Sequence, residues 1–113
     1  MKLPNAGRAT IDPTKLRDYL LSSAHPVGRF KVQFFETLGY AQDDWPRLEA
    51  DLRAQHLSQD AQPATGSQYG QKYEIRAILT GVAGRSAEVV SVWIILVGED
   101  TPRFVTAYPG GTP

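Results

Sequence analysis

Apolar residues recur every three or four positions along the first half of the chain, which is typical of amphipathic helices. The first predicted helix begins at Asp12 and Pro13, because aspartate can accept hydrogen bonds from free N–H groups and proline has no N–H to leave unpaired. A second helix is predicted from about Pro26 to Gly39, and a third from about Asp43 to His56. The apolar stripes of these helices are Leu16, Tyr19 and Leu20; Val27, Phe30, Phe34, Phe35 and Leu38; and Trp45, Leu48 and Leu52.

The second half of the chain follows a period of two instead. Residues 58–68 (SQDAQPATGSQ) have no apolar period and are predicted to be a flexible linker. The next stretch, YGQKYEIRAILTG, alternates between apolar and polar positions, which predicts a strand. One face of that strand would carry Lys72, Glu74 and Arg76.

The run from Val89 to Val97 is apolar on both faces except at Ser91, so we expect it to be the central strand, with Trp93 in the core. Turn residues follow at Gly98 to Pro102, and RFVTAYP then predicts a further strand. Helices followed by strands indicate an α+β fold, here three N-terminal helices packed on a three- to four-stranded antiparallel meander sheet. We expect one domain over residues 1–113, with a helical part at 12–57, the linker at 58–68 and a sheet part at 69–109.

Composition excludes several classes of function. The chain has 12 Lys and Arg against 12 Asp and Glu, so no net charge attracts duplex DNA or a membrane surface, and neither is expected as a partner. It has no cysteine, no metal-binding spacing and no nucleotide-binding fingerprint, and we expect neither a metal nor a cofactor. It also shows no signal peptide and no apolar run long enough to span a bilayer, which favours a cytoplasmic location.

Residues 25–31, HPVGRFK, form the first candidate site. A histidine before a proline can simply mark the start of a helix, and this is the more common situation. Imidazole, however, is the side chain that exchanges protons most readily near neutral pH, and helix starts favour anions. His25 as general acid or base, with Arg29 and Lys31 on a phosphate, is therefore the functional hypothesis.

The last strand and a set of basic residues supply further candidates. Thr106 and Tyr108 lie two positions apart and so share one face of the strand, although both are also ordinary strand residues. Which face they share depends on a turn in which a slip of one residue reverses it. His56 would interact with the dipole of the third helix. Candidate phosphate contacts around one groove, or else a solvated charged face, are Lys72, Arg76, Arg85 and Arg103.

Nearly the whole chain resembles a family of small uncharacterised bacterial proteins. The resemblance rests on the strings NAGRATIDPTKLRDYLLSSAHPVGRFKVQFFETLGY, YGQKYEIRAILTG, GRSAEVVSVWII and PRFVTAYP. More loosely, helices followed by an antiparallel sheet and a last strand with T-x-Y-P are similar to the superfamily of barnase, colicin and RelE-like ribonucleases. Members of that superfamily are typically metal-independent toxins that cleave RNA through the ribose 2′-hydroxyl.

That resemblance implies a catalytic position in the last strand, where Thr106 and Tyr108 lie, and a helix with His25, Arg29 and Lys31 beside the cleft. It predicts a cytoplasmic endoribonuclease of a toxin–antitoxin or related defence system, with RNA as substrate and a small antitoxin-like protein as partner. The alternative is a non-catalytic binding module, an antitoxin or immunity-like protein, that offers the FVTAYP strand as an edge to another chain.

Overall fold

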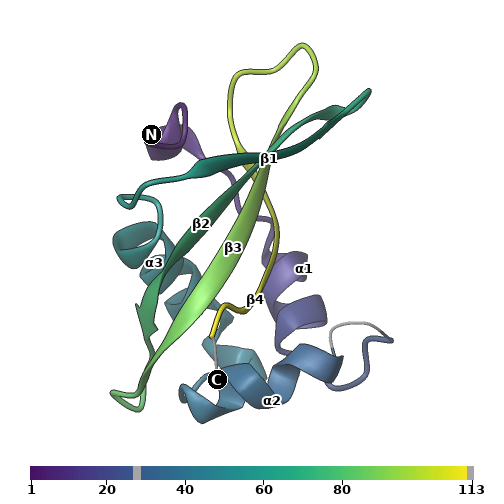
Figure 1. The fold of residues 1–113 in the computed structure, drawn as a ribbon. Helices are drawn as coiled ribbons and strands as arrows, with labels where there is room; N and C mark the ends of the chain where they lie inside the picture. Colours follow the sequence, from purple (N-terminus) through teal and green to yellow (C-terminus); the bar gives the residue numbers. More distant parts are fainter. Residues whose placement is uncertain (27–28, 112–113) are drawn as a thin grey trace.

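The computed structural model describes residues 1–26 and 29–111, apart from the side chain of Phe30. Within this part the chain forms α-helices first and strands afterwards (Figure 1). The helices are α1 (Pro13–Lys15), α2 (Arg29–Thr37) and α3 (Trp45–Gln55). The strands are β1 (Gln62–Ser67), β2 (Gly70–Thr80), β3 (Ser86–Leu96) and β4 (Arg103–Pro109). Val27 of the predicted second stripe lies outside the described residues, and nothing is described of the Phe30 side chain.

The helix starts follow their capping residues. The carboxylate of Asp12 accepts a hydrogen bond of 3.0 Å from the Thr14 N–H, which confirms the predicted start of α1. The helix continues as a π-helical turn over Leu16–Leu20, in which the Leu21 N–H donates to the Leu16 carbonyl at 2.9 Å. The helices are not all at the N-terminus, since α3 ends at Gln55, near the middle of the chain.

The four strands form one antiparallel meander in the order β1-β2-β3-β4, which confirms the α+β class. β3 lies between β2 and β4, as the apolar run Val89–Val97 predicts. The prediction of a flexible linker at 58–68 is wrong, because this segment contains β1, which pairs with the first half of β2. Its sequence, QPATGS, is exposed along most of its length, so it has no buried face to produce an alternating pattern.

The core lies between one face of the sheet and the helices. In Figure 1, α3 lies behind β2 and α1 lies beside β4. Trp93 is fully buried at the centre of β3, and its ring meets the Phe104 ring at 5.3 Å. The helices contribute fully or almost fully buried side chains from each predicted stripe: Leu16, Leu20, Phe35, Leu38, Leu48 and Leu52. None of the described helices is long and apolar enough to cross a membrane.

His56 belongs to this core, and the predicted interaction with the helix dipole is wrong. Its ring is fully buried, with Nδ1 2.8 Å from the hydroxyl of Ser91. The same hydroxyl accepts a hydrogen bond of 2.9 Å from the Trp93 indole, which explains why a serine interrupts the apolar central strand. Burial lowers the pKa of His56 to about 4, although the Ala77 backbone opposes this effect. The ring is therefore uncharged at neutral pH and adds no cation to the end of α3.

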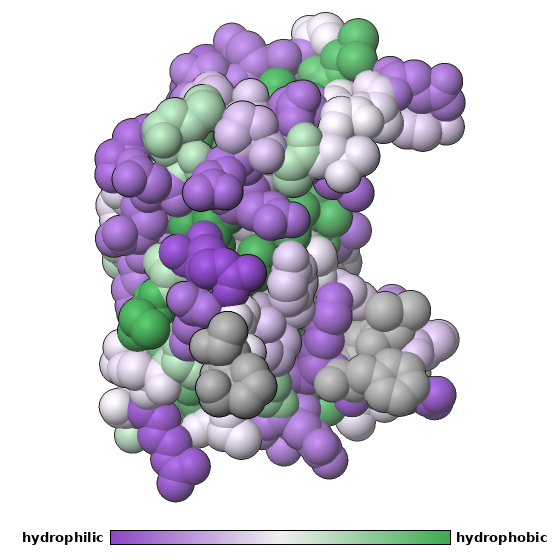
Figure 2. Space-filling model, viewed as in Figure 1, coloured by the Kyte–Doolittle hydropathy of each residue, from purple (hydrophilic) through white to green (hydrophobic). Residues whose placement is uncertain are grey.

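The opposite face of the sheet carries the charged residues that the alternation predicts. Lys72, Glu74 and Arg76 pair across the ladder with Ile94, Val92 and Val90, in that order. Gly110, which directly follows β4, lies against this face, where its carbonyl accepts a hydrogen bond of 2.6 Å from Arg76. Figure 2 shows this side of the molecule as a mixture of hydrophilic and hydrophobic residues.

Candidate functional site

A bulge in β4 decides which way Thr106 points. Val92 pairs with Thr106 but Trp93 pairs with Phe104, so Val105 is an extra residue in the ladder. Phe104 consequently faces the core beside Trp93, while Thr106 shares the opposite face with Val92. This answers the question of face that the sequence leaves open.

Tyr19 reaches Thr106 from the π-helical turn that follows α1. Its phenol oxygen lies 3.1 Å from the Thr106 hydroxyl, and its side chain is half-buried. A π-helical turn adds one residue to a helical turn and changes the direction of the side chains on it, and such turns are frequent at functional sites. The sequence pattern assigns Tyr19 only to the apolar stripe of the first helix.

Lys31 completes a triangle of polar groups. Its ammonium, which comes from α2, donates to the Tyr19 phenol at 2.6 Å and to the Thr106 hydroxyl at 2.9 Å. The three side chains come from three separate elements, with 75 residues between Lys31 and Thr106. The Lys31 ammonium therefore uses two of its three N–H groups on the oxygens of Tyr19 and Thr106. No carboxylate takes part in the triangle.

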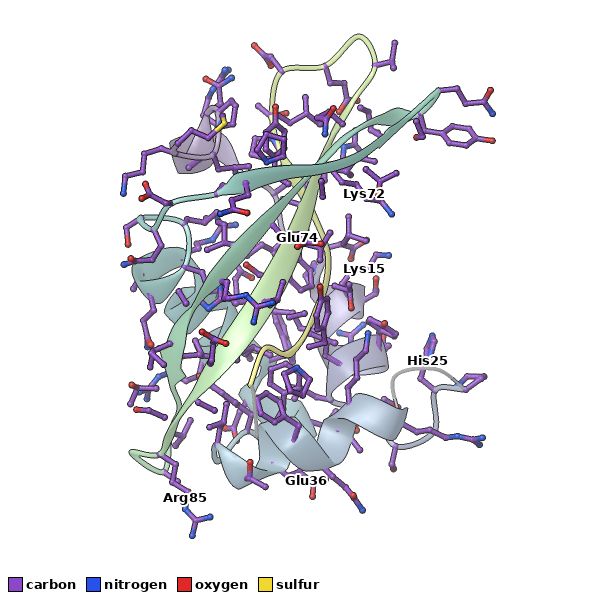
Figure 3. All side chains as sticks on the ribbon, viewed as in Figure 1. Lys15, His25, Glu36, Lys72, Glu74 and Arg85 are labelled. Carbon is purple, nitrogen blue, oxygen red and sulfur yellow. The ribbon has the colours of Figure 1, made fainter. Side chains whose placement is uncertain are left out.

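A cavity of about 580 Å³ opens beside this triangle. Tyr19 and Thr106 form part of its wall, together with His25, whose ring meets the Tyr19 ring edge-to-face at 4.8 Å. The remaining wall residues are Thr14, Lys15, Asp18 and Val105. Figure 3 shows Lys15 and His25 on the same side of the molecule, and Figure 2 shows that side hollowed below the projecting β1–β2 hairpin.

The electrostatics of the cavity favour the ionised form of Tyr19. Burial alone would raise the pKa of this phenol, but the hydrogen bonds with Lys31 and Thr106 and the positive charge of Lys31 outweigh burial and lower it. A tyrosine of this kind gives up its proton more readily than one in water. The cavity wall therefore carries a phenol with a lowered pKa and an imidazole, and an ammonium group lies one hydrogen bond behind it.

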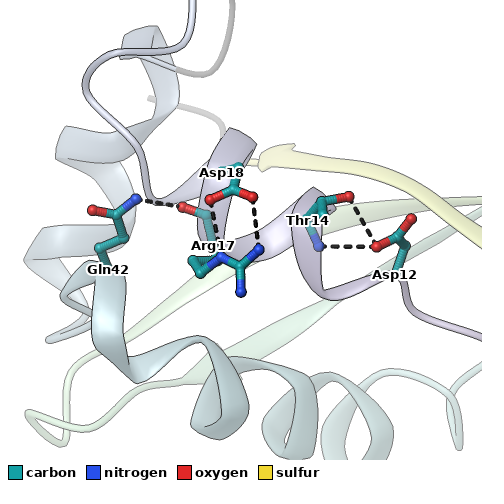
Figure 4. A network of polar contacts seen from close by, with 5 residues as sticks. All are labelled: Asp12, Thr14, Arg17, Asp18 and Gln42. Carbon is teal, nitrogen blue, oxygen red and sulfur yellow. Dashed lines mark hydrogen bonds and ion pairs between the residues drawn. The ribbon is translucent and has the colours of Figure 1, made fainter.

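Hydrogen bonds fix the wall that carries Asp18 (Figure 4). Arg17 donates to both carboxylate oxygens of Asp18 at 2.9 Å, and this pairing lowers the pKa of Asp18. Gln42 donates to the Arg17 carbonyl at 2.8 Å, which ties the π-helical turn to the segment before α3. The π-helical turn that presents Tyr19 is thus tied to a second segment of the chain.

The structure brings together three of the five residues proposed for HPVGRFK and VTAYP. His25 and Thr106 line the cavity, and Lys31 lies one hydrogen bond behind its wall, on Thr106. Tyr108 shares a face with Thr106 but lies opposite Val90 and does not line the cavity. Arg29 borders a different depression, with Glu36, and does not line the cavity beside His25. Val27 and Gly28 of this motif lie outside the described residues.

The four basic residues assigned to one groove are spread over the sheet. Arg76 is paired with Glu88 at 2.9 Å, and Arg103 is paired with Glu99 at 2.6 Å. Lys72 lies near the projecting end of the sheet and Arg85 in the turn at its opposite end (Figure 3). The cavity instead has Lys15 on its wall, and no motif in the sequence marks this exposed lysine of the first helix as functional.

The role of Tyr19 could not be found from sequence spacing alone. Tyr19 has no motif around it, and only its contact with Lys31, twelve residues along the chain, gives it a chemical role. Among the described residues, no group of three or more His, Asp or Glu side chains is arranged to hold a metal ion. What the site offers is proton transfer and positive charge beside a hollow of small-molecule size.

The comparisons with known proteins define a family and no activity. Neither a search of the curated proteins nor a search of the solved structures found a match. A family model described as a domain of unknown function, DUF6883, matches residues 2–111. This match covers β4 as well as every helix, and so includes all of the cavity residues. The chain belongs to the DUF6883 family.

Proposed function

We propose that this chain is a metal-independent endoribonuclease, acting in the cytoplasm as the toxin module of a toxin–antitoxin or related defence system. The observation that carries the proposal is that His25 and Thr106 line one cavity and that Lys31 donates to Thr106 on its wall. Thr106 lies far along the chain from His25 and Lys31, and together the three residues supply groups that RNA cleavage without a metal requires. The order of helices and then an antiparallel sheet is in keeping with a barnase or RelE-like fold, which we propose on the same basis.

The proposed reaction is an attack of the ribose 2′-oxygen on the adjacent phosphorus. The 2′-hydroxyl loses its proton to a base, the new P–O bond forms, and the bond to the 5′-oxygen breaks. An acid protonates that 5′-oxygen, so the products are a 2′,3′-cyclic phosphate and a 5′-hydroxyl. Negative charge builds up on the phosphate during this step, and nearby cations stabilise it.

The residues around the cavity can divide this work. His25 lines the cavity and is the proposed acid for the 5′-oxygen. Lys15 on the wall is the proposed phosphate contact, and the Lys31 ammonium, one hydrogen bond from the wall, adds positive charge. The Thr106 hydroxyl, also on the wall, is the proposed group that orients the 2′-hydroxyl. Arg76 and Arg103 have carboxylate partners, so we no longer assign them to the phosphate.

A cleavage assay in EDTA tests the proposal. We expect the protein to cut a single-stranded RNA of mixed sequence and leave a 2′,3′-cyclic phosphate, because no step requires a divalent ion. The matched substrate is the same oligonucleotide with 2′-O-methyl groups, which should remain intact. Absence of cleavage, or equal cleavage of the methylated strand, would refute the proposed reaction.

One observation favours a second candidate, a protein-binding module. Tyr69 and Val97 are 68% and 72% exposed, and they lie side by side because the Val97 N–H donates to the Tyr69 carbonyl at 2.9 Å. Exposed apolar neighbours at the tip of a sheet are typical of contact sites for another protein. If binding is the function, co-purification with the product of a neighbouring gene should be lost on Tyr69→Ser and retained on His25→Ala.

A further inference from the structure

We propose that Tyr19 is a catalytic residue, the general base that takes the proton from the 2′-hydroxyl. This inference deepens the proposed ribonuclease function and rests on it. Tyr19 is on the cavity wall and within hydrogen-bond distance of both Lys31 and Thr106. The sequence predicts a phenol in this reaction but assigns it to Tyr108, which does not line the cavity.

The hydrogen bonds in the triangle leave Tyr19 as the group best able to act as a base. Lys31 is the donor to both oxygens of the triangle, so it is not the group that takes up a proton. An aliphatic hydroxyl such as that of Thr106 is far too weak an acid to be ionised near neutral pH. A phenolate beside an ammonium at 2.6 Å forms a charge-assisted pair, which favours the ionised form of Tyr19.

Burial strengthens the pair, since neither partner is fully exposed. Tyr19 and Lys31 are both half-buried, and Lys31 is near the Tyr19 ring as well as its oxygen, with 5.0 Å from the ammonium to the ring centre. Water screens such a pair less than it screens an exposed one. The lowered pKa of Tyr19 is in keeping with this arrangement.

His25 lines the same cavity as Tyr19 and is the proposed acid that accompanies this base. Its ring meets the Tyr19 ring edge-to-face, so the imidazole and the phenol lie on adjoining parts of the wall. A reaction that removes one proton and delivers another needs two groups placed in this way. Tyr19 as base leaves His25 as acid, whereas the sequence alone leaves the role of His25 open between the two.

The first experiment measures ionisation without any substrate. The near-ultraviolet absorbance of phenolate, followed during an alkaline titration of the folded protein, should show an early step from one of the five tyrosines. Tyr19→Phe should remove that step, and Lys31→Met should move it to higher pH. Tyr69→Phe, at the exposed hairpin tip, is the matched control and should leave it unchanged. An early step that persists in Tyr19→Phe would overturn the proposal.

The second experiment measures cleavage with the same variants. Tyr19→Phe keeps the ring and should lower kcat by roughly 10²- to 10⁴-fold with little change in KM and an unchanged thermal melt. In Lys31→Met the rising limb of the pH–rate profile should move to higher pH along with the absorbance step. Full activity of Tyr19→Phe would overturn the role of Tyr19 while leaving the ribonuclease intact. If the wild-type protein cleaves no RNA, both proposals fail, whatever the absorbance titration gives.

Discussion

The two histidines of the chain lie in opposite environments. His25 is half-exposed on the wall of a cavity, against the ring of Tyr19 and close to a lysine triangle. His56 is fully buried between α3 and the sheet, bonded to Ser91 and held uncharged. The first borders open space, whereas the second is enclosed by the core.

The comparison shows that the kind of neighbour, rather than the kind of residue, decides the chemistry. Ser91 and Thr106 are both strand hydroxyls bonded to a basic side chain. Ser91 bonds to Nδ1 of a buried ring and accepts from an indole, so its capacity for hydrogen bonds is used within the core. Thr106 instead meets a charged lysine beside open space.

The largest expected effect is on RNA cleavage, which should depend on His25 and not on His56. His25→Ala should lower RNA cleavage by roughly 10²- to 10⁴-fold, because it removes the proposed acid, and should leave the thermal melt unchanged. The measurement is initial rate in EDTA beside the melt of the same sample. Wild-type cleavage by His25→Ala, or a melt as early as that of Phe35→Ala in the core, would remove His25 from the mechanism.

The next effect is on the free energy of unfolding, which should depend on His56 and not on His25. His56→Ala should lower the free energy of unfolding by about 3 kcal/mol, because it leaves a hole in the core and takes a partner from Ser91. Cleavage per folded molecule should stay at the wild-type level. Denaturant unfolding checks the first expectation, and an unfolding midpoint equal to that of wild type would contradict it.

A smaller effect comes from pH. The folded pKa of His56, about 4, is below the ordinary 6.5, so the unfolded chain takes up a proton first as pH falls and the folded state is destabilised between these values. At about pH 5 this difference amounts to roughly 2 kcal/mol. His56→Gln should lose that part of the pH dependence, while His25→Ala should keep it. Denaturant unfolding at several pH values compares the slopes, and identical slopes in all three proteins would rule the effect out.

The smallest expected effect is on duplex DNA. The formal net charge is zero, and several arginines already have carboxylate partners, so little positive charge remains to neutralise a phosphate backbone. We expect no sub-micromolar binding to a labelled duplex at roughly 0.15 M salt. Tight binding that His25→Ala leaves intact would show a basic surface away from the cavity.

Much of the fold follows from local patterns in the sequence. The cap at Asp12, the burial of Trp93 and the central place of β3 are each set by residues close to one another along the chain. β1 was missed because an exposed edge strand has no buried side to reveal it. The partner of Ser91 was missed for a different reason, since a buried serine signals that a partner exists but not which one.

The candidate site could be predicted only in part. His25 and Lys31 stand out through the composition of HPVGRFK, and Thr106 through its place in the last strand. Tyr19 does not, because its role depends on the π-helical turn and on contacts with two other elements. Arg29 and Arg76, which the sequence groups with the site, do not line the cavity, because periodicity predicts the face of an element and not what lies against that face.

The extra residue in β4 has a consequence for how this family tolerates changes in length. In a regular strand Phe104 and Thr106 would point to the same face of the sheet. Phe104 could then not lie in the core while Thr106 lines the cavity. Removing Val105 would leave both side chains on their present faces and lose only part of the cavity wall. Adding a residue between Thr106 and Ala107 would instead turn one of them to the wrong side. Natural gains and losses of residues in this strand should therefore fall at position 105.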